Sequence, residues 1–364
     1  MANPGKFMKI GVVGLAIAAM LIAENISPSL AIADSKTPAK MLFGSKPLPA
    51  DLDSQAVGFY SKGCLAGGIA IPVDGPNWQV MRLSRNRRWG HPQLIGLLEE
   101  LSIKAKKIGW NGLMVGDLSQ PRGGPMLTGH TSHQVGLDAD IWFTPMPDKR
   151  LTYKEREELS AVSVLKKGSL YVDNRRWKQS YTDLMRETAR FPEVQRILVH
   201  PGIKKKLCDT VKGDRSWLSK IRPFYGHHYH FHVRIFCPKD SPGCKPQKAV
   251  GSDIGCDGKA LKWWFDVALK PRKPSKNDKP AKKREKVLSD LPKTCIKILN
   301  AGEIPSDKAE FPIQAASFNA PKIDIPEIDP AAILASKPIE ASKAAKSSGQ
   351  SDVEIPVPTP RPKQ

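Results

Sequence analysis

The sequence GHTSHQVGLDAD at residues 129–140 and the sequence HHYHFH at residues 227–232 carry most of the histidine of this chain. The chain has eight histidines, and six of them lie in these two stretches. Imidazole together with carboxylate is a common donor set for a catalytic Zn²⁺ that keeps one position open for water. The two stretches therefore predict two halves of one metal site, and a hydrolase is the leading interpretation.

The second stretch is expected to enter a strand over residues 230–236, because aromatic and β-branched residues dominate it. Alternate side chains of a strand share a face, so His230 and His232 would point the same way, with Phe231 buried behind them. A surface histidine tract that binds metal adventitiously is the main alternative. Four histidines within six residues favour a functional cluster.

The first stretch combines a loop histidine with acids on a following strand. A turn at Gly136 would bring His133 back beside that strand, since glycine accepts left-handed backbone. Asp138 and Asp140 would share one face of the strand. The spacing alone leaves open which of the two acids binds a metal and which caps a turn.

The surrounding pattern predicts an α+β fold in which a small antiparallel sheet carries the metal ligands and helices flank it. The globular domain that would carry this metal site is expected to span residues 59–300. The expected helices cover residues 92–107, 153–165, 177–191 and 208–221. The expected strands cover residues 110–117, 137–143, 194–199 and 230–236, and residues 118–131 are expected to be loop.

Residues 1–33 have the pattern of a signal peptide. Lys6 and Lys9 precede the apolar run 10–23, and Ala31-Ile32-Ala33 supplies small residues for cleavage before Asp34. An uncleaved N-terminal anchor is the alternative. No later stretch is apolar enough to cross a bilayer, so no membrane span is expected after cleavage. Residues 34–58 are expected to be a loose leader segment.

The six cysteines predict three disulfide bonds in an oxidising compartment. None belongs to a C-x-x-C pair, and the sequence alone allows 15 pairings. Proximity favours Cys237–Cys244, which encloses a short loop with proline and glycine. The alternative is that some thiols stay free and buried.

The formal charge of +21 suggests an anionic polymer as partner. An exported protein does not normally meet nucleic acid, whereas cell-wall peptides carry free carboxylates. Residues 270–286 are rich in lysine and proline and resemble a linker, and residues 301–364 are expected to be disordered.

Several motifs together resemble the penicillin-insensitive murein endopeptidases, within the metallopeptidase superfamily of lysostaphin, D-Ala-D-Ala peptidases and hedgehog domains. They are Arg87-Arg88-Trp89-Gly90-His91-Pro92, residues 116–124, Gly129-His130-x-Ser132-His133-Gln134-x-Gly136-Leu137-Asp138-x-Asp140, Arg222-Pro223 and His230-x-His232. The six cysteines also match, and the resemblance covers roughly residues 55–300. It implies a periplasmic peptidase that hydrolyses D-alanyl–meso-diaminopimelyl cross-links in peptidoglycan.

The resemblance also implies roles for individual residues. His133, Asp140 and His232 would hold a Zn²⁺, with water as the fourth ligand. His230 would act as general base or transition-state stabiliser, His227 would assist, and His130 can contribute to a further metal site. The Asp-Gly-x-His-like element that the family often carries is absent, which speaks against a second metal. The implied disulfide bonds are Cys64–Cys295, Cys208–Cys256 and Cys237–Cys244.

Other interpretations compete with this one. A D,D-carboxypeptidase with the same zinc core is the nearest, and a non-catalytic cell-wall-binding module is the next. Serine catalysis is disfavoured because no G-x-S-x-G motif occurs. His91 and His200 each precede a proline and are expected to fix helix starts. The tryptophans are expected to be mainly core residues, with one or two of them in a glycan-peptide groove.

Overall fold

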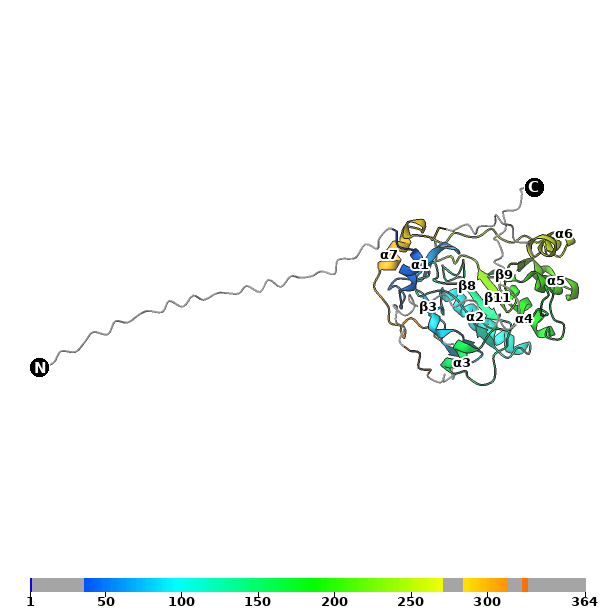
Figure 1. Ribbon diagram of the computed structural model, residues 1–364, viewed down its shortest axis with the longest axis horizontal. Helices are drawn as coiled ribbons and strands as arrows, with labels where there is room; N and C mark the ends of the chain where they lie inside the picture. The colour runs from blue at the N-terminus through cyan, green and yellow to red at the C-terminus, as the bar shows by residue number, and fades with distance from the viewer. Residues whose placement is uncertain (2–35, 271–283, 313–322, 327–364) are drawn as a thin grey trace, which may run out of the picture. The chain divides into compact units, whose positions relative to one another are not determined.

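The structure of the chain is a computed structural model that describes residue 1 and residues 36–270, 284–312 and 323–326 (Figure 1). The fold described here belongs to the unit Asp34–Gln364. It is α+β, as predicted, with a seven-stranded mixed sheet in the order β10-β9-β11-β8-β7-β5-β4. These strands are β4 (Asp74–Gly75), β5 (Trp78–Val80), β7 (Leu113–Val115), β8 (Asp138–Trp142), β9 (Val194–Val199), β10 (Ile221–Pro223) and β11 (His230–Ile235).

The prediction of a small antiparallel sheet is wrong for this sheet as a whole. Its centre is antiparallel, since β11 runs antiparallel to both β8 and β9. On either side a parallel pair extends it, β9 with β10 and β5 with β7. Parallel pairing needs a long crossover, and here crossovers containing helices join those strands. The residue pattern within a single strand does not show whether its neighbour in the sheet will be parallel or antiparallel.

Two small antiparallel pairs lie outside the main sheet: β1 (Gln55–Phe59) pairs with β2 (Lys62–Ala66), and β3 (Ile69–Ala70) pairs with β6 (Trp89–Gly90). The α-helices of the described residues are α1 (Ala39–Gly44), α2 (Pro92–Lys107), α3 (Tyr153–Glu158), α4 (Gln179–Arg190), α5 (Pro201–Thr210), α6 (Gly258–Trp263) and α7 (Thr294–Asn300). None of these helices has the length and apolar character that a membrane crossing requires.

One face of the central strands belongs to the hydrophobic core. Ala139 and Ile141 of β8 and Phe231 and Val233 of β11 are buried in the same cluster as the apolar faces of α2 and α4. Because side chains alternate along a strand, the acids of β8 and the histidines of β11 are left for the opposite face. The core therefore decides which face of the sheet carries the polar cluster.

The predicted helices agree with the structure where the apolar spacing is regular. The helix over 92–107 is α2, whereas the helix expected over 153–165 ends at Glu158, because Leu159 is already extended. The helix expected over 208–221 is wrong. Helix α5 begins at Pro201 and ends at Thr210, and Gly213 then has a left-handed φ of 70° before a short 3₁₀ turn, η2 (Ser216–Lys220). Proline in the first turn favours that earlier start.

The segment 34–58, expected to be loose, is packed where the structure describes it. Ala39, Phe43 and Ala50 are buried in a second hydrophobic cluster with Leu299 of α7. Helix α1 lies beside α7 in Figure 1. The polar composition of the segment did not indicate this packing, because only a few apolar side chains make the contact.

The first part of the segment 301–364, expected to be disordered, is ordered where the structure describes it. Glu303 bridges to Ala50 and Glu310 bridges to Ala70, so residues 301–312 run along the domain. The predicted signal peptide lies outside the described residues except for Met1. Residues 271–283 of the predicted linker and residues 313–322 and 327–364 of the predicted tail also lie outside them.

Three disulfide bonds join all six cysteines: Cys64–Cys295, Cys208–Cys256 and Cys237–Cys244. This is the pairing that the family resemblance implied. Cys64 and Cys295 are fully buried and join β2 to α7. The bond therefore connects segments that lie 231 residues apart in the chain.

The guanidinium of Arg122 donates hydrogen bonds to carbonyl groups at the C-terminal end of α7. Its Nη1 donates to the carbonyls of Ile298, Leu299 and Ala301 at 2.8–2.9 Å, and its Nε donates to Leu48 O. The Arg122 side chain is fully buried. Since the last carbonyls of a helix have no partner within the helix, this one side chain satisfies groups that would otherwise be buried and unpaired.

Replacing Arg122 with methionine is expected to lower the free energy of unfolding by about 3 kcal/mol, because several buried carbonyls lose their donor. Urea unfolding followed by circular dichroism measures the change. The matched control is Arg190→Met, whose side chain is exposed and pairs with Glu187 on the surface of α4. Equal stability of the two variants would contradict the assigned role of Arg122.

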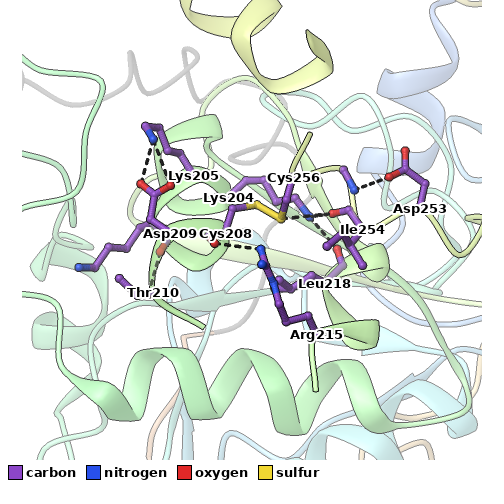
Figure 2. The surroundings of a disulfide bond; sticks show 12 residues. Lys204, Lys205, Cys208, Asp209, Thr210, Arg215, Leu218, Asp253, Ile254 and Cys256 are labelled. Atoms are coloured by element: carbon purple, nitrogen blue, oxygen red, sulfur yellow. Dashed lines mark hydrogen bonds and ion pairs between the residues drawn. A yellow bond between two sulfur atoms is a disulfide. The ribbon is translucent and has the colours of Figure 1, made fainter. Parts of the chain in front are cut away.

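A buried lysine lies beside the Cys208–Cys256 disulfide (Figure 2). Lys204 Nζ donates to Leu218 O at 2.7 Å and also to Ile254 O, and the side chain is fully buried. It thus holds the residue two positions before Cys256. Burial lowers the pKa of Lys204 to about 7, and the nearby charge of Arg222 adds to this effect.

The stability of the protein relative to Lys204→Met is expected to rise between about pH 7 and pH 10. The folded state releases the lysine proton near pH 7, while the unfolded chain keeps it up to about 10.5. In that window the unfolded state binds more protons, so the free energy of unfolding rises by at most about 1.4 kcal/mol per pH unit. Urea titrations at pH 7, 8 and 9 measure this difference.

The matched control for this titration is Lys205→Met, since Lys205 is a surface residue paired with Asp209. Its stability difference from the wild type should stay flat over the same range. A flat difference for Lys204→Met as well would show that Lys204 is protonated in the folded state throughout.

Candidate metal centre

The register between β8 and β11 brings the two histidine-rich stretches together. His232 lies directly opposite Asp140, and His230 lies opposite Trp142. Asp140, His230 and His232 are all buried. The two stretches thus meet on the face of the sheet that the core leaves free.

The loop before β8 bends so that His133 reaches the same place. Gly136 has a φ of 71°, so the turn expected there is confirmed. His133 itself has a left-handed φ of 67°, a strained conformation for a residue with a side chain. Its backbone N–H donates to Asp138 Oδ2 at 3.0 Å, and this bond holds the loop.

Three side-chain atoms form a small triangle. His133 Nε2 lies 3.1 Å from His232 Nδ1 and 3.4 Å from Asp140 Oδ1, and His232 Nδ1 lies 3.2 Å from the same oxygen. Asp140 Oδ1 is buried and makes no hydrogen bond among the described residues. Three electron-pair donors crowded together in this way are a feature of cation sites.

The other carboxylate oxygen of Asp140 faces two further histidines. Asp140 Oδ2 lies 3.5 Å from His130 Nε2 and 3.5 Å from His230 Nε2. Ligand atoms of His130, His133 and Asp140 all lie within 4.8 Å of one another, so this group could also hold a metal ion. Asp140 is the one carboxylate common to both arrangements.

Asp138 has a different environment from Asp140. Its carboxylate accepts two hydrogen bonds from Arg234, at 2.7 and 3.0 Å, and contacts His232 Nε2 at 3.0 Å. This contact turns His232 so that its Nδ1 faces Asp140. The two acids that spacing could not distinguish therefore have different environments: Asp138 contacts the loop and the His232 ring, while Asp140 faces the cluster.

Burial keeps several of these imidazoles neutral. Burial lowers the pKa of His133, and it lowers the pKa of His230 to about 4 and that of His227 to about 3. Neutral imidazole is the form that binds metals or accepts a proton. His232 and His130 differ, because their carboxylate neighbours outweigh burial and raise the pKa of each.

His227 lies at the edge of the cluster. Its ring centroid is 4.9 Å from that of His230 and 5.7 Å from that of His232. Its backbone is left-handed, with a φ of 54°. His228 turns away and contacts Ser163 Oγ at 2.9 Å. The structure therefore gathers five of the six clustered histidines and excludes His228.

The remaining two histidines are structural, as predicted. His91 Nδ1 accepts the Gln93 N–H at the start of α2, and His200 Nδ1 accepts the Gly202 N–H at the start of α5. Each caps its helix and is followed by proline in the first turn.

The sequence did not single out the residues that support His130. Asp117 Oδ2 contacts His130 Nε2 at 3.0 Å and also accepts from Arg87 and Arg85 at 2.9 and 3.0 Å. These nearby charges hold the pKa of the buried Asp117 carboxyl well below its ordinary value, against the opposing effect of burial. Arg87 and Asp117 lie within motifs quoted for the family resemblance, and that was the available signal.

The fold and the cluster together define an α+β protein with a buried candidate metal centre of imidazoles and one carboxylate. A model of the family described as penicillin-insensitive murein endopeptidase matches residues 56–300. The chain therefore belongs to the penicillin-insensitive murein endopeptidase family.

Similar proteins with this name cover most of the domain. The one from Haemophilus influenzae is 42% identical over 265 residues, which is 70% of this chain and 86% of that protein. The one from Escherichia coli K12 is 36% identical over 256 residues, 70% of this chain and 89% of that protein. The one from Pectobacterium atrosepticum is 35% identical over 266 residues, 73% and 89% of the two chains.

Proposed function

We propose that the protein is a zinc-dependent murein endopeptidase that acts in the periplasm. Its substrate would be the D-alanyl–meso-diaminopimelyl cross-link of peptidoglycan. Membership of the family supports the murein endopeptidase activity. The zinc requirement, the bond and the compartment are proposals that rest on the residues described above.

The observation that carries the metal assignment is the triangle of His133 Nε2, His232 Nδ1 and Asp140 Oδ1. Its sides measure 3.1, 3.2 and 3.4 Å. Ligands bound tetrahedrally at 2.0–2.1 Å would lie roughly 3.3 Å from one another. Two imidazole nitrogens and one carboxylate oxygen are also the donor types that Zn²⁺ takes in catalytic sites. The residues therefore fit a zinc ion with an open fourth position.

Bound there, zinc would polarise the scissile carbonyl and lower the pKa of water to about 7. The chain itself supplies the remaining functions. The Asp138 carboxylate contacts Nε2 of His232 and so orients this ring, and Arg234 donates a hydrogen bond that holds Asp138 in place. Such support of a ligand by a carboxylate raises its basicity and sets its orientation.

His230 is the candidate general base. Its Nε2 is buried and makes no hydrogen bond among the described residues, and it points toward Asp140 at 3.5 Å. Because burial keeps the ring neutral, it can accept a proton from water and return it to the leaving amine. His227 lies next to it and would assist. His130 already contacts Asp117 and Asp140, so we propose that it supports the ligands or joins a further metal site.

Digestion of purified peptidoglycan by the mature protein tests this function. Cross-linked muropeptide dimers are expected to fall to monomers, with loss of activity in chelator and recovery with zinc. The masses of the released muropeptides identify the bond. Release of terminal D-alanine without loss of dimers would indicate a D,D-carboxypeptidase instead, and binding without any mass change would indicate a non-catalytic wall-binding module.

A further inference from the structure

A run of aromatic side chains leads outward from the candidate metal centre. The ring of His227 contacts Phe224 at 5.5 Å between centroids, and Phe224 contacts Tyr225 at 6.3 Å. Tyr225 then contacts Trp264 at 5.0 Å, and Trp264 contacts Trp263 at 5.2 Å. The run is thus continuous from a histidine of the centre to α6.

Several rings of this run are open to solvent. Phe224 is 48% exposed and Trp263 is 38% exposed. Tyr171, also 48% exposed, stacks on Phe265 with an angle of 4° between the rings. Adjacent exposed aromatics are unusual on a soluble protein and mark binding surfaces. We call the following six side chains the aromatic surface: Tyr171, Phe224, Tyr225, Trp263, Trp264 and Phe265.

The segment that carries three of these rings is fastened at both ends. The Cys208–Cys256 disulfide lies two residues before α6, and Lys204 holds the carbonyl of Ile254 (Figure 2). At the far end, Tyr225 Oη donates to Ala268 O at 3.5 Å. The segment is therefore positioned by covalent and polar contacts.

Packing into the hydrophobic core does not explain why this segment is held by a disulfide bond and hydrogen bonds. Leu261 is the buried residue of α6, and the π-helical turn Trp264–Ala268 that follows it buries none of its side chains. π-Helical turns are rare and are frequently found at functional sites. A segment that is firmly anchored, contributes little to the core and presents aromatic rings is suited to binding.

We propose that the aromatic surface binds the glycan strand of peptidoglycan. A pyranose ring has flat faces of C–H groups, which pack on aromatic rings, and hydroxyl groups around its rim. Charge also fits, since residues 258–270 contain three lysines and one aspartate and the strand bears peptides with free carboxylates. The inference rests on the proposed function: a strand held here would present its stem peptide to the centre beside His227.

The experiment compares two ligands and two classes of variant in the full mature chain. Trp263→Ala and Trp264→Ala are expected to weaken binding to peptide-free glycan strands about tenfold, which corresponds to about 1.4 kcal/mol. Isothermal titration calorimetry measures this binding. Both variants should cleave a sugar-free cross-linked peptide dimer at the rate of the wild type, while KM for intact peptidoglycan rises. The matched control is Phe236→Ala, which removes a ring of the same 38% exposure outside the aromatic surface.

A second variant tests the anchoring without touching an aromatic ring. Joint replacement of Cys208 and Cys256 by serine is expected to weaken glycan binding while cleavage of the sugar-free dimer persists. Unchanged glycan binding in both tryptophan variants would overturn the proposal. Weaker binding of the peptide dimer, with glycan binding intact, would assign the surface to the peptide instead. Failure of the wild type to cleave either substrate would refute the proposed function, and the glycan titration would still report on the surface.

Discussion

Replacing Asp140 with asparagine is expected to reduce murein endopeptidase activity by on the order of 10³-fold or more and to prevent zinc binding at the proposed site. Asp140 supplies the charged donor of the triangle, and its other oxygen faces His130 and His230. Asparagine keeps the shape but loses the negative charge that balances a divalent cation. Loss of a supporting residue costs about 10–100-fold, so loss of a ligand should cost more.

Two measurements check this result: the rate on a soluble muropeptide dimer and the zinc content of the purified protein. Asp138→Asn offers a graded comparison, because Asp138 orients His232 without facing the cluster. It should retain much of the metal and lose less activity. Asp209→Asn, at an exposed carboxylate that pairs with Lys205 on the surface of α5, is the inert control. An Asp140→Asn protein with full activity and full zinc content would refute the ligand assignment.

Removing the Cys64–Cys295 disulfide by joint replacement with alanine is expected to cost roughly 5 kcal/mol of stability. The bond joins residues 231 apart, so it strongly restricts the unfolded chain. It also holds α7 against the cluster that contains Ala39 and Phe43 of α1. Both ends of the domain would therefore loosen together.

Thermal and urea unfolding of the oxidised protein measure this loss. The matched control is removal of the Cys237–Cys244 disulfide, which spans only 7 residues and should cost roughly 2 kcal/mol by the same entropy argument. Equal costs for the two bonds would show that native contacts, rather than chain entropy, determine the contribution of each disulfide.

Local signals explain which elements were predictable. Helix α2 matched because its apolar spacing, the capping side chain of His91 and Pro92 all act within a few residues. The prediction of a helix over 208–221 was wrong, because the apolar spacing in this range continues across three different structures. They are the end of α5, the left-handed Gly213 and a 3₁₀ turn. The direction of β5 and β10 depended on partners far along the chain.

The candidate site was also predictable only in part. The two histidine stretches and the turn at Gly136 could be predicted from the sequence, because spacing fixes which side chains share a face of a strand. The choice between Asp138 and Asp140 was not, since both lie on one face. The structure separates them by their partners: Asp138 pairs with Arg234, whereas Asp140 faces His133 and His230.

The sequence by itself determined the chemistry that the protein can offer: six clustered histidines, two strand acids, six cysteines and a basic chain. The tertiary structure decided how these groups are used. The β8–β11 register places His232 opposite Asp140, and Arg234 forms an ion pair with Asp138. The disulfide bonds link α7 to β2 and the segment before α6 to α5. The physical reason is that residue type and spacing set local conformation, whereas charge pairing and ligand geometry depend on distances of a few ångströms between segments remote in the chain.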